Sequence, residues 1–207
     1  FTAIQAISRT LENKLWHQAK FKIGLSPSLK GNGMAFSVDV IKNNPWNAFS
    51  ISEDVEYFAQ LVMRGINIGF SHLGIVYHEE SRSFDEAHYQ RIRWSTGKFE
   101  IAKRYGLRLI WDGIVHKSWN KIDAGLFFLL PYTSLQINMH VILILLTLMY
   151  IKSKIVLFKT SIVLMIFQMF YLGIGFCISR PTWNKVKSLL MAPVFLLWKA
   201  YIDVIGA

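Results

Sequence analysis

The spacing of apolar side chains divides the 207-residue chain near residue 122. Before that point, apolar residues recur every three or four positions in residues 3–18 and 52–65, which is the period of an amphipathic helix. We predict a helix in each of these stretches and a longer helix over residues 85–105.

The expected helix ends are marked by small polar residues and by glycine. Ser52 precedes two acidic residues, so we predict that it caps the second helix, because a hydroxyl there can accept a free backbone N–H and acids suit the helix dipole. Gly65 and Gly106 follow the last apolar positions of the second and third helices. Glycine is the usual residue after a helix end, so both are predicted ends.

Two other stretches are typical of extended structure. Residues 66–77 alternate loosely and are rich in Ile, Phe, Val and Tyr, which predicts one strand or two short ones. Residues 34–41 indicate a short strand or a buried extended segment, between a glycine-rich loop and an Asn-Asn-Pro turn signal. Helices mixed with strands predict an α/β segment over residues 1–106.

The pattern changes to long apolar runs after residue 122. Residues 124–150 carry no formal charge, and residues 155–178 are interrupted only by Lys159. About 20 apolar residues cross a bilayer core, so both are predicted spans, and 189–205 is a weaker third. Residues 107–122 combine tryptophan with basic side chains, which predicts a helix at the membrane surface. We therefore divide the chain into 1–106, 107–122 and 123–207, a transmembrane region.

The polar residues of the first predicted span permit two interpretations. They are Pro131, Gln136, Asn138 and His140. Either the span is kinked, or its polar face lines a protein interior. His140 is as well explained by helix packing as by a ligand or proton site.

Charge and composition favour lipid over nucleic acid as a partner. The chain carries 23 Lys and Arg against 13 Asp and Glu, and its apolar fraction of 53% is high for a soluble domain. Basic residues beside apolar spans bind anionic headgroups, whereas no basic run or zinc spacing indicates nucleic acid. The single cysteine, Cys177, excludes an internal disulfide.

Three short motifs contain the candidate chemistry. Gly31 and Gly33 flank Asn32 and let the backbone approach a ligand closely, although alone they indicate a turn. Glu53 and Asp54 form a carboxylate pair that can act as a general base, although alone they are better explained as helix-capping acids.

The third motif lies on the third predicted helix. Gln90, Arg93 and Trp94 have the spacing that shares one helix face. An amide, a guanidinium and an indole together can bind a sugar and a phosphate, and a solvated face with an anchoring Trp is an equal alternative. His78-Glu79-Glu80 also suggests a metal site, but a strand end with solvated acids explains it better.

In this order, the three motifs resemble those of inverting family 2 glycosyltransferases. Glu53-Asp54 is similar to the family's Thr-Glu-Asp motif, with Ser52 in place of Thr. Residues 90–94 match its Gln-x-x-Arg-Trp motif in full. The stretch 24–36 resembles bacterial exopolysaccharide enzymes of the processive, cellulose-synthase-like group. The resemblance implies the carboxy-terminal part of a GT-A-type domain followed by transmembrane helices.

The resemblance also implies a reaction and a role for each residue. The enzyme would transfer a sugar from a nucleotide-sugar donor to a glycan or lipid-linked acceptor, by displacement with inversion. Asp54 would be the general base and Glu53 would support it. The implied substrate-binding residues are Gln90 and Arg93 on the donor pyrophosphate, Trp94 on the acceptor sugar, and Gly31 and Gly33 in the acceptor pocket.

The resemblance implies Mg²⁺ or Mn²⁺, yet the family's metal-binding Asp-x-Asp motif has no match here. Glu12 is the only acid before Gly31, so we expect the metal ligands and the nucleotide-binding half upstream of Phe1. By itself this chain would then be inactive. The expected location is the inner or plasma membrane, multi-pass, with the catalytic part in the cytoplasm. A non-catalytic membrane subunit, or a remnant that only binds partners, is the alternative.

Overall fold

The computed structural model of the protein describes residues 2–77, 79, 81, 84–130, 132–149, 151–180 and 182–206. His78, Glu80 and Pro131 of the sequence analysis lie outside the described residues. The chain divides into two compact units, which are described separately below. Unit 1 is Phe1–Leu15 with Pro131–Val204, and unit 2 is Trp16–Leu130 with Ile205–Ala207.

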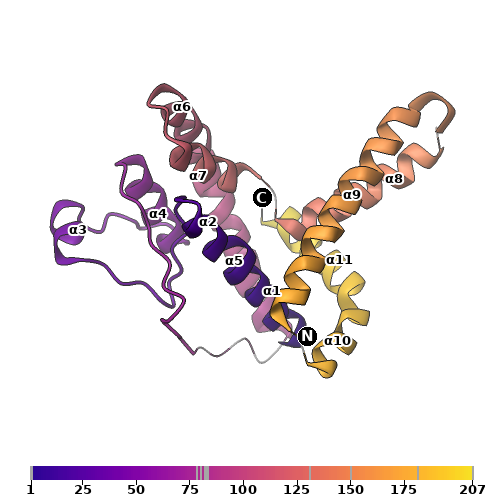
Figure 1. Ribbon diagram of the computed structural model, residues 1–207, viewed down its shortest axis with the longest axis horizontal. Helices are drawn as coiled ribbons and strands as arrows, with labels where there is room; N and C mark the ends of the chain where they lie inside the picture. Colours follow the sequence, from indigo (N-terminus) through magenta and orange to yellow (C-terminus); the bar gives the residue numbers. More distant parts are fainter. Residues whose placement is uncertain are drawn as a thin grey trace. The chain divides into compact units, whose positions relative to one another are not determined.

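The described residues form helices joined by irregular segments (Figure 1). Each of the three predicted helices is present, but the first and third are interrupted or extended by π-helical turns. The α-helices are α1 (Thr2–Leu11), α2 (Gln18–Lys22), α3 (Val38–Asn43), α4 (Glu53–Met63), α5 (Phe84–Ile101), α6 (Leu107–Val115), α7 (Trp119–Leu129), α8 (Thr133–Met149), α9 (Ile151–Ser179), α10 (Trp183–Ser188) and α11 (Ala192–Ile205), with π-helical segments at Glu12–His17 and Ala102–Gly106 and a 3₁₀ turn at Leu189–Met191.

The predicted α/β fold class is wrong, because the structure is 74% helical and its described residues contain no strand. Residues 66–77 are irregular, and an alternating segment forms a strand only beside another extended segment that takes up its hydrogen bonds. Tyr77, near the end of this segment, is 92% exposed. Of the predicted strand at 34–41, residues 34–37 are irregular and the rest lies in α3, whose start Ser37 caps because its Oγ accepts the N–H of Val40 at 3.3 Å.

The predicted helix end at Gly106 is also wrong, because the chain continues through the π-helical segment into α6. Gly106 is buried and has helical dihedral angles. A Cβ built on it would lie 2.7 Å from Leu129 Cδ2, so the missing side chain allows α7 to pack closely here. By contrast, Gly65 has φ +77° and follows the end of α4, as predicted.

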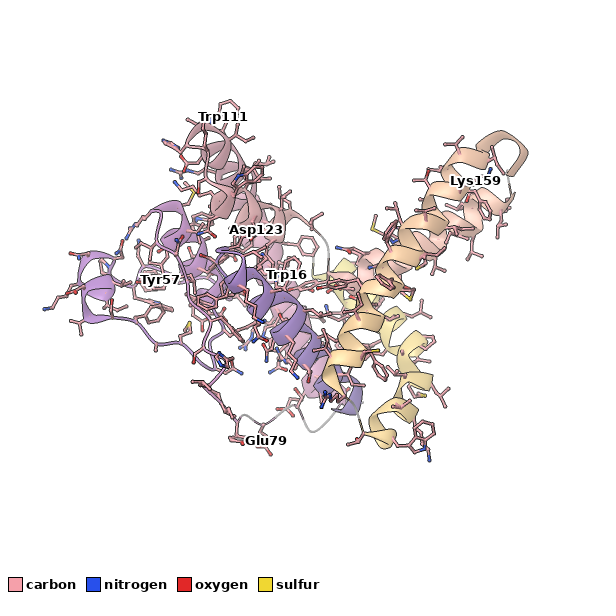
Figure 2. The ribbon with its side chains drawn as sticks, viewed as in Figure 1. Trp16, Tyr57, Glu79, Trp111, Asp123 and Lys159 are labelled. Atoms are coloured by element: carbon pink, nitrogen blue, oxygen red, sulfur yellow. The ribbon has the colours of Figure 1, made fainter. Side chains whose placement is uncertain are left out.

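The core of unit 2 forms where α4 contacts α5, α6 and α7. Tyr57 and Phe58 of α4 are fully buried, and Tyr57, labelled in Figure 2, packs toward the α3 side, with its ring centroid 4.5 Å from that of Trp46. Phe58 packs against Phe128 of α7, with ring centroids 5.9 Å apart. Near the start of α7, Lys20 donates to Asp123 Oδ2 at 2.7 Å. Burial lowers the pKa of the Lys20 ammonium, and the bond to Asp123 opposes that shift.

The helices α6 and α7 form a hairpin that occupies the predicted surface helix and the start of the first predicted span (Figure 1). Asp112 of α6 accepts a hydrogen bond from Lys121 of α7 and lies 3.1 Å from His116 Nδ1. The bond from Lys121, helped by the neighbouring positive charges, holds the pKa of the Asp112 carboxyl below its usual value.

This ion pair predicts a pH-dependent contribution to the stability of the hairpin. A carboxyl with a lowered pKa stabilises the fold above its unfolded pKa of about 3.9, and the contribution is lost as pH falls through the lower folded value. We therefore expect Asp112→Asn to reduce the unfolding temperature at pH 7. The difference from the wild-type protein should shrink below about pH 4. Thermal unfolding in detergent from pH 7 to pH 2 measures this, and a difference independent of pH would contradict it.

Unit 1 contains the long apolar helices. Among the described residues, one helix is long and apolar enough to cross a membrane, Ile155–Ile178 within α9, which coincides with the second predicted span. The first predicted span is interrupted between Leu129 and Thr133. Its two helices, α7 and α8, are long and apolar enough to cross a membrane only if they are counted together as one bent span. The third predicted span comprises the 3₁₀ turn and α11.

Polar side chains of α8 join it to both α9 and α11, with α8 and α9 side by side in Figure 1. His140 Nδ1 lies 3.1 Å from Gln168 Oε1 of α9. Asn138 donates to the carbonyl of Leu196 at 3.1 Å, and Ser134 donates to Asp203 Oδ2 at 3.0 Å. The polar residues of the first predicted span therefore take part in helix packing. Lys199 pairs with the fully buried Asp203 on α11.

Candidate functional site

The first two sequence motifs meet at the start of α4. Asp54 is the second residue of this helix, and its Oδ2 accepts the backbone N–H of Gly31 at 2.7 Å. The loop that carries Gly31 closes on itself, because Gly33 N–H donates to the carbonyl of Lys30 at 3.0 Å. A Cβ on Gly33 would lie 3.2 Å from Val76 Cγ2. The hydrogen bond from the Gly31 main chain thus holds the glycine-rich turn against the Asp54 carboxylate.

The Asp54 carboxylate is oriented by main-chain donors on both oxygens. Oδ1 accepts the N–H of Val55 at 2.8 Å, and Oδ2 accepts that of Gly31. A carboxylate oxygen has room for a second hydrogen bond, so each oxygen can still accept a proton from a ligand. Asp54 is half-buried and its neighbour Glu53 is exposed. This geometry is suitable for a fixed general base beside a freely hydrated carboxylate.

The start of α4 is also in close contact with α5. Ser52 is buried but its side chain does not cap the helix, so the predicted capping role is wrong. The hydroxyl faces Gly97 of α5 instead, and a Cβ on Gly97 would lie 2.0 Å from Ser52 Oγ. Gly97 follows Trp94 by three residues on the same helix. The contact therefore joins the second motif to the helix that carries the third.

Substitution of Gly97 tests this contact. Gly97→Ala places a methyl group against Ser52, and overpacking of this kind typically costs about 1–3 kcal/mol. We expect a lower unfolding temperature, because the start of α4 must shift to make room for the methyl group. Ser52→Gly removes both of the closest atoms, so the double variant Gly97→Ala/Ser52→Gly should regain stability. Differential scanning fluorimetry of the three variants measures the effect, and equal loss in the single and double variants would contradict it.

The third motif lies on α5, with its three side chains in different surroundings. Gln90 is half-buried and its Oε1 accepts the hydroxyl of Ser81 at 3.1 Å. Trp94 is half-buried, and the guanidinium of Arg91 lies 5.4 Å from its ring centroid. Arg93 is exposed. An exposed guanidinium near a half-buried amide and indole can bind an anionic ligand from solvent.

The family model described as "Glycosyl transferase family group 2" matches residues 7–178, which is most of the chain. The chain belongs to glycosyl transferase family group 2. No curated protein and no solved structure matches it. Family membership supports glycosyl transfer in general, with a nucleotide-sugar donor and an acceptor as the substrates.

Members of the glycosyl transferase family often use a divalent metal. Within the part of the chain that the structure describes, no group of three His, Cys, Asp or Glu side chains is placed to hold one. We therefore assign no described residue to Mg²⁺ or Mn²⁺.

Two parts of this candidate site lie outside the three sequence motifs. Gly97 has a sequence signal, because a glycine inside a helical pattern often marks close packing. The other is Glu56, which is 2% exposed, and whose Oε1 accepts Arg104 Nη1 at 2.6 Å. No local pattern predicts that pair, since Arg104 is distant in sequence and lies in the π-helical segment.

Proposed function

We propose that this glycosyltransferase is a membrane-bound, inverting enzyme of the processive-synthase-like group. It transfers a sugar from a nucleotide-sugar donor to a growing polysaccharide or to a lipid-linked acceptor. The observation that carries the proposal is the hydrogen bond from Gly31 N–H to Asp54 Oδ2 at 2.7 Å. It joins the glycine turn, which lines the acceptor pocket in this proposal, to the carboxylate that acts as the base.

The reaction is a single displacement. Asp54 accepts the proton of an acceptor hydroxyl, and that oxygen attacks the anomeric carbon of the donor sugar. The bond between the anomeric carbon and the diphosphate oxygen breaks, and the nucleoside diphosphate leaves with the bonding electrons. Because attack and departure occur on opposite faces, the configuration at the anomeric carbon inverts.

Residues of α5 bind the two substrates in this proposal. Arg93 is exposed and its guanidinium matches two oxygens of a diphosphate, which places it on the leaving group. Gln90 is fixed by Ser81 and braces the same region. Trp94 offers a partly exposed indole on which the acceptor sugar stacks.

Exposed apolar side chains support the membrane part of the proposal. The candidate span Ile155–Ile178 buries only 11% of its most apolar window inside the protein, as a helix surrounded by lipid would. Trp111 and Trp119 of the α6–α7 hairpin are 71% and 77% exposed, and Figure 2 shows Trp111 on α6. Exposed Arg108 and Lys117 lie on the same hairpin. Tryptophan with basic residues is typical of the bilayer interface. The catalytic part then lies on the cytoplasmic face of the plasma membrane.

A donor panel tests the proposal. Membranes that contain the protein as its gene encodes it are incubated with labelled nucleotide sugars, Mg²⁺ or Mn²⁺, and added glycan or lipid acceptors. Transfer that requires Asp54 and inverts the anomeric configuration supports the proposal, and the product length separates a polymer from a single addition. Transfer with retention contradicts the proposed displacement. No transfer from any donor, or transfer indifferent to Asp54, favours a non-catalytic membrane subunit.

A further inference from the structure

Glu56 is a buried carboxylate that none of the three motifs includes. Its side chain is 2% exposed, and a buried charge is tolerated only where hydrogen bonds or an opposite charge compensate it. Glu56 has both kinds of compensation. Oε2 accepts the backbone N–H of Phe49 at 3.0 Å and of Ser50 at 2.9 Å, and Oε1 accepts Arg104 Nη1.

The loop bound by Glu56 is the one that leads into Glu53 and Asp54. We call residues 44–52 the leading loop. Two further side chains of α4 bind the main chain of the loop. Tyr57 Oη donates to the Asn44 carbonyl at 2.5 Å, and Gln60 Nε2 donates to the Asn47 carbonyl at 2.8 Å. Phe49 is 82% exposed, so hydrogen bonds to its main chain, rather than burial of its side chain, anchor the loop at this residue.

Arg104 connects this anchor to the helix of the third motif. It lies in the π-helical segment Ala102–Gly106, which directly continues α5. A π-helical turn inserts an extra residue and so changes the direction of the side chains that follow it. The Arg104 side chain is 57% exposed, yet its guanidinium reaches the buried carboxylate at 2.6 Å. One ion pair thus joins the end of the Gln90–Trp94 helix to the leading loop.

We propose that Glu56 and Arg104 are positioning residues for Asp54, an inference that rests on the proposed function. Asp54 precedes Glu56 by two residues. The leading loop ends at Ser52, just before Glu53 and Asp54 begin the helix. If the pair is broken, the anchor of Phe49 and Ser50 loosens. The start of α4 then shifts against the glycine turn, so the Gly31 N–H bond to Asp54 lengthens. The base is displaced while the donor-binding residues of α5 stay in place.

Steady-state kinetics give the first test. Arg104→Gln removes the charge at a largely exposed position, so we expect kcat to fall by about tenfold or more while the donor KM changes less than about twofold. Arg104→Lys keeps a charge that can reach Glu56 and should recover most of kcat. Lys103→Gln is the matched control, because Lys103 is the exposed neighbour and should leave kcat unchanged.

Amide hydrogen exchange of the full protein gives a second test that does not depend on activity. Arg104→Gln should speed exchange in the peptide that covers the leading loop by at least about fivefold. The glycine turn 30–33 should respond as well, because its bond to Asp54 depends on the same anchor. Lys103→Gln should change neither peptide.

The outcomes separate this inference from the function on which it rests. Unchanged kcat in Arg104→Gln, in an enzyme that Asp54→Asn inactivates, overturns the inference and leaves the proposed function standing. Exchange that rises only in the leading loop, with kcat loss matched by a falling unfolding temperature, assigns the pair a structural role alone and also overturns it. Transfer that persists in Asp54→Asn overturns both.

Discussion

Asp54→Asn is expected to lower kcat for sugar transfer by about a thousandfold, because general-base catalysis typically contributes about 10²–10⁴-fold. The asparagine carbonyl can still accept the N–H of Gly31, so the glycine turn should stay in place. The amide nitrogen cannot accept the N–H of Val55, so the variant loses that one hydrogen bond together with the capacity to take a proton. Radiolabelled product formed per minute at saturating donor and acceptor measures the effect.

Two further variants define the specificity of that result. Glu53→Gln should lower kcat by about tenfold at most, because Glu53 is exposed and can act only through its neighbour. Asp39→Asn changes an exposed acid in the first turn of α3 and should have no effect. Equal losses in Glu53→Gln and Asp54→Asn would mean that the pair, and not Asp54 alone, is the base.

Asp203→Ala is expected to have the largest effect on stability in unit 1, about 3–5 kcal/mol. Asp203 is fully buried, where it accepts from Ser134 and pairs with Lys199. Its removal leaves the buried ammonium of Lys199 without that carboxylate, although the ring of Tyr132 remains 4.3 Å away. Thermal unfolding in detergent micelles measures the loss.

A double replacement separates loss of the pair from loss of packing. In Lys199→Met/Asp203→Val both charges are replaced by apolar side chains close to them in size, so no buried charge remains. Substitutions of this kind are often neutral or stabilising. We expect the double variant to unfold at or above the wild-type temperature. A double variant as unstable as Asp203→Ala would show that the loss comes from the missing bond between Ser134 and Asp203 and not from an uncompensated Lys199 charge.

Helices were predictable from the sequence because their signal is local. The three- and four-residue spacing of 52–65 depends on neighbours along the chain, and α4 lies where that spacing places it. A strand forms only when another strand, often far away in the sequence, pairs with it. Residues 66–77 alternate between apolar and polar side chains, but no strand among the described residues pairs with them. The helix end predicted at Gly106 was wrong because glycine occurs where helices pack closely as well as where helices end.

The candidate site was predictable only in part for the same reason. The motifs identified Asp54 and Gly31, and the structure brings these two together through one hydrogen bond. The contacts that hold them come from residues far apart in sequence, such as Ser52 against Gly97. Glu56 lies among the apolar positions of α4, where a charged residue indicates that a partner compensates its charge. No pattern in the neighbouring sequence identifies Arg104 as that partner.

Side chains of α4 bind the leading loop through atoms of its main chain. The four bonds from α4 use the carbonyls of Asn44 and Asn47 and the amides of Phe49 and Ser50. Every amino acid except proline supplies these atoms, so the anchoring survives most changes of side chain at 49 and 50. Evolution can therefore vary the side chains at 49 and 50, close in sequence to the proposed base Asp54, without loss of the bonds that hold this part of the loop.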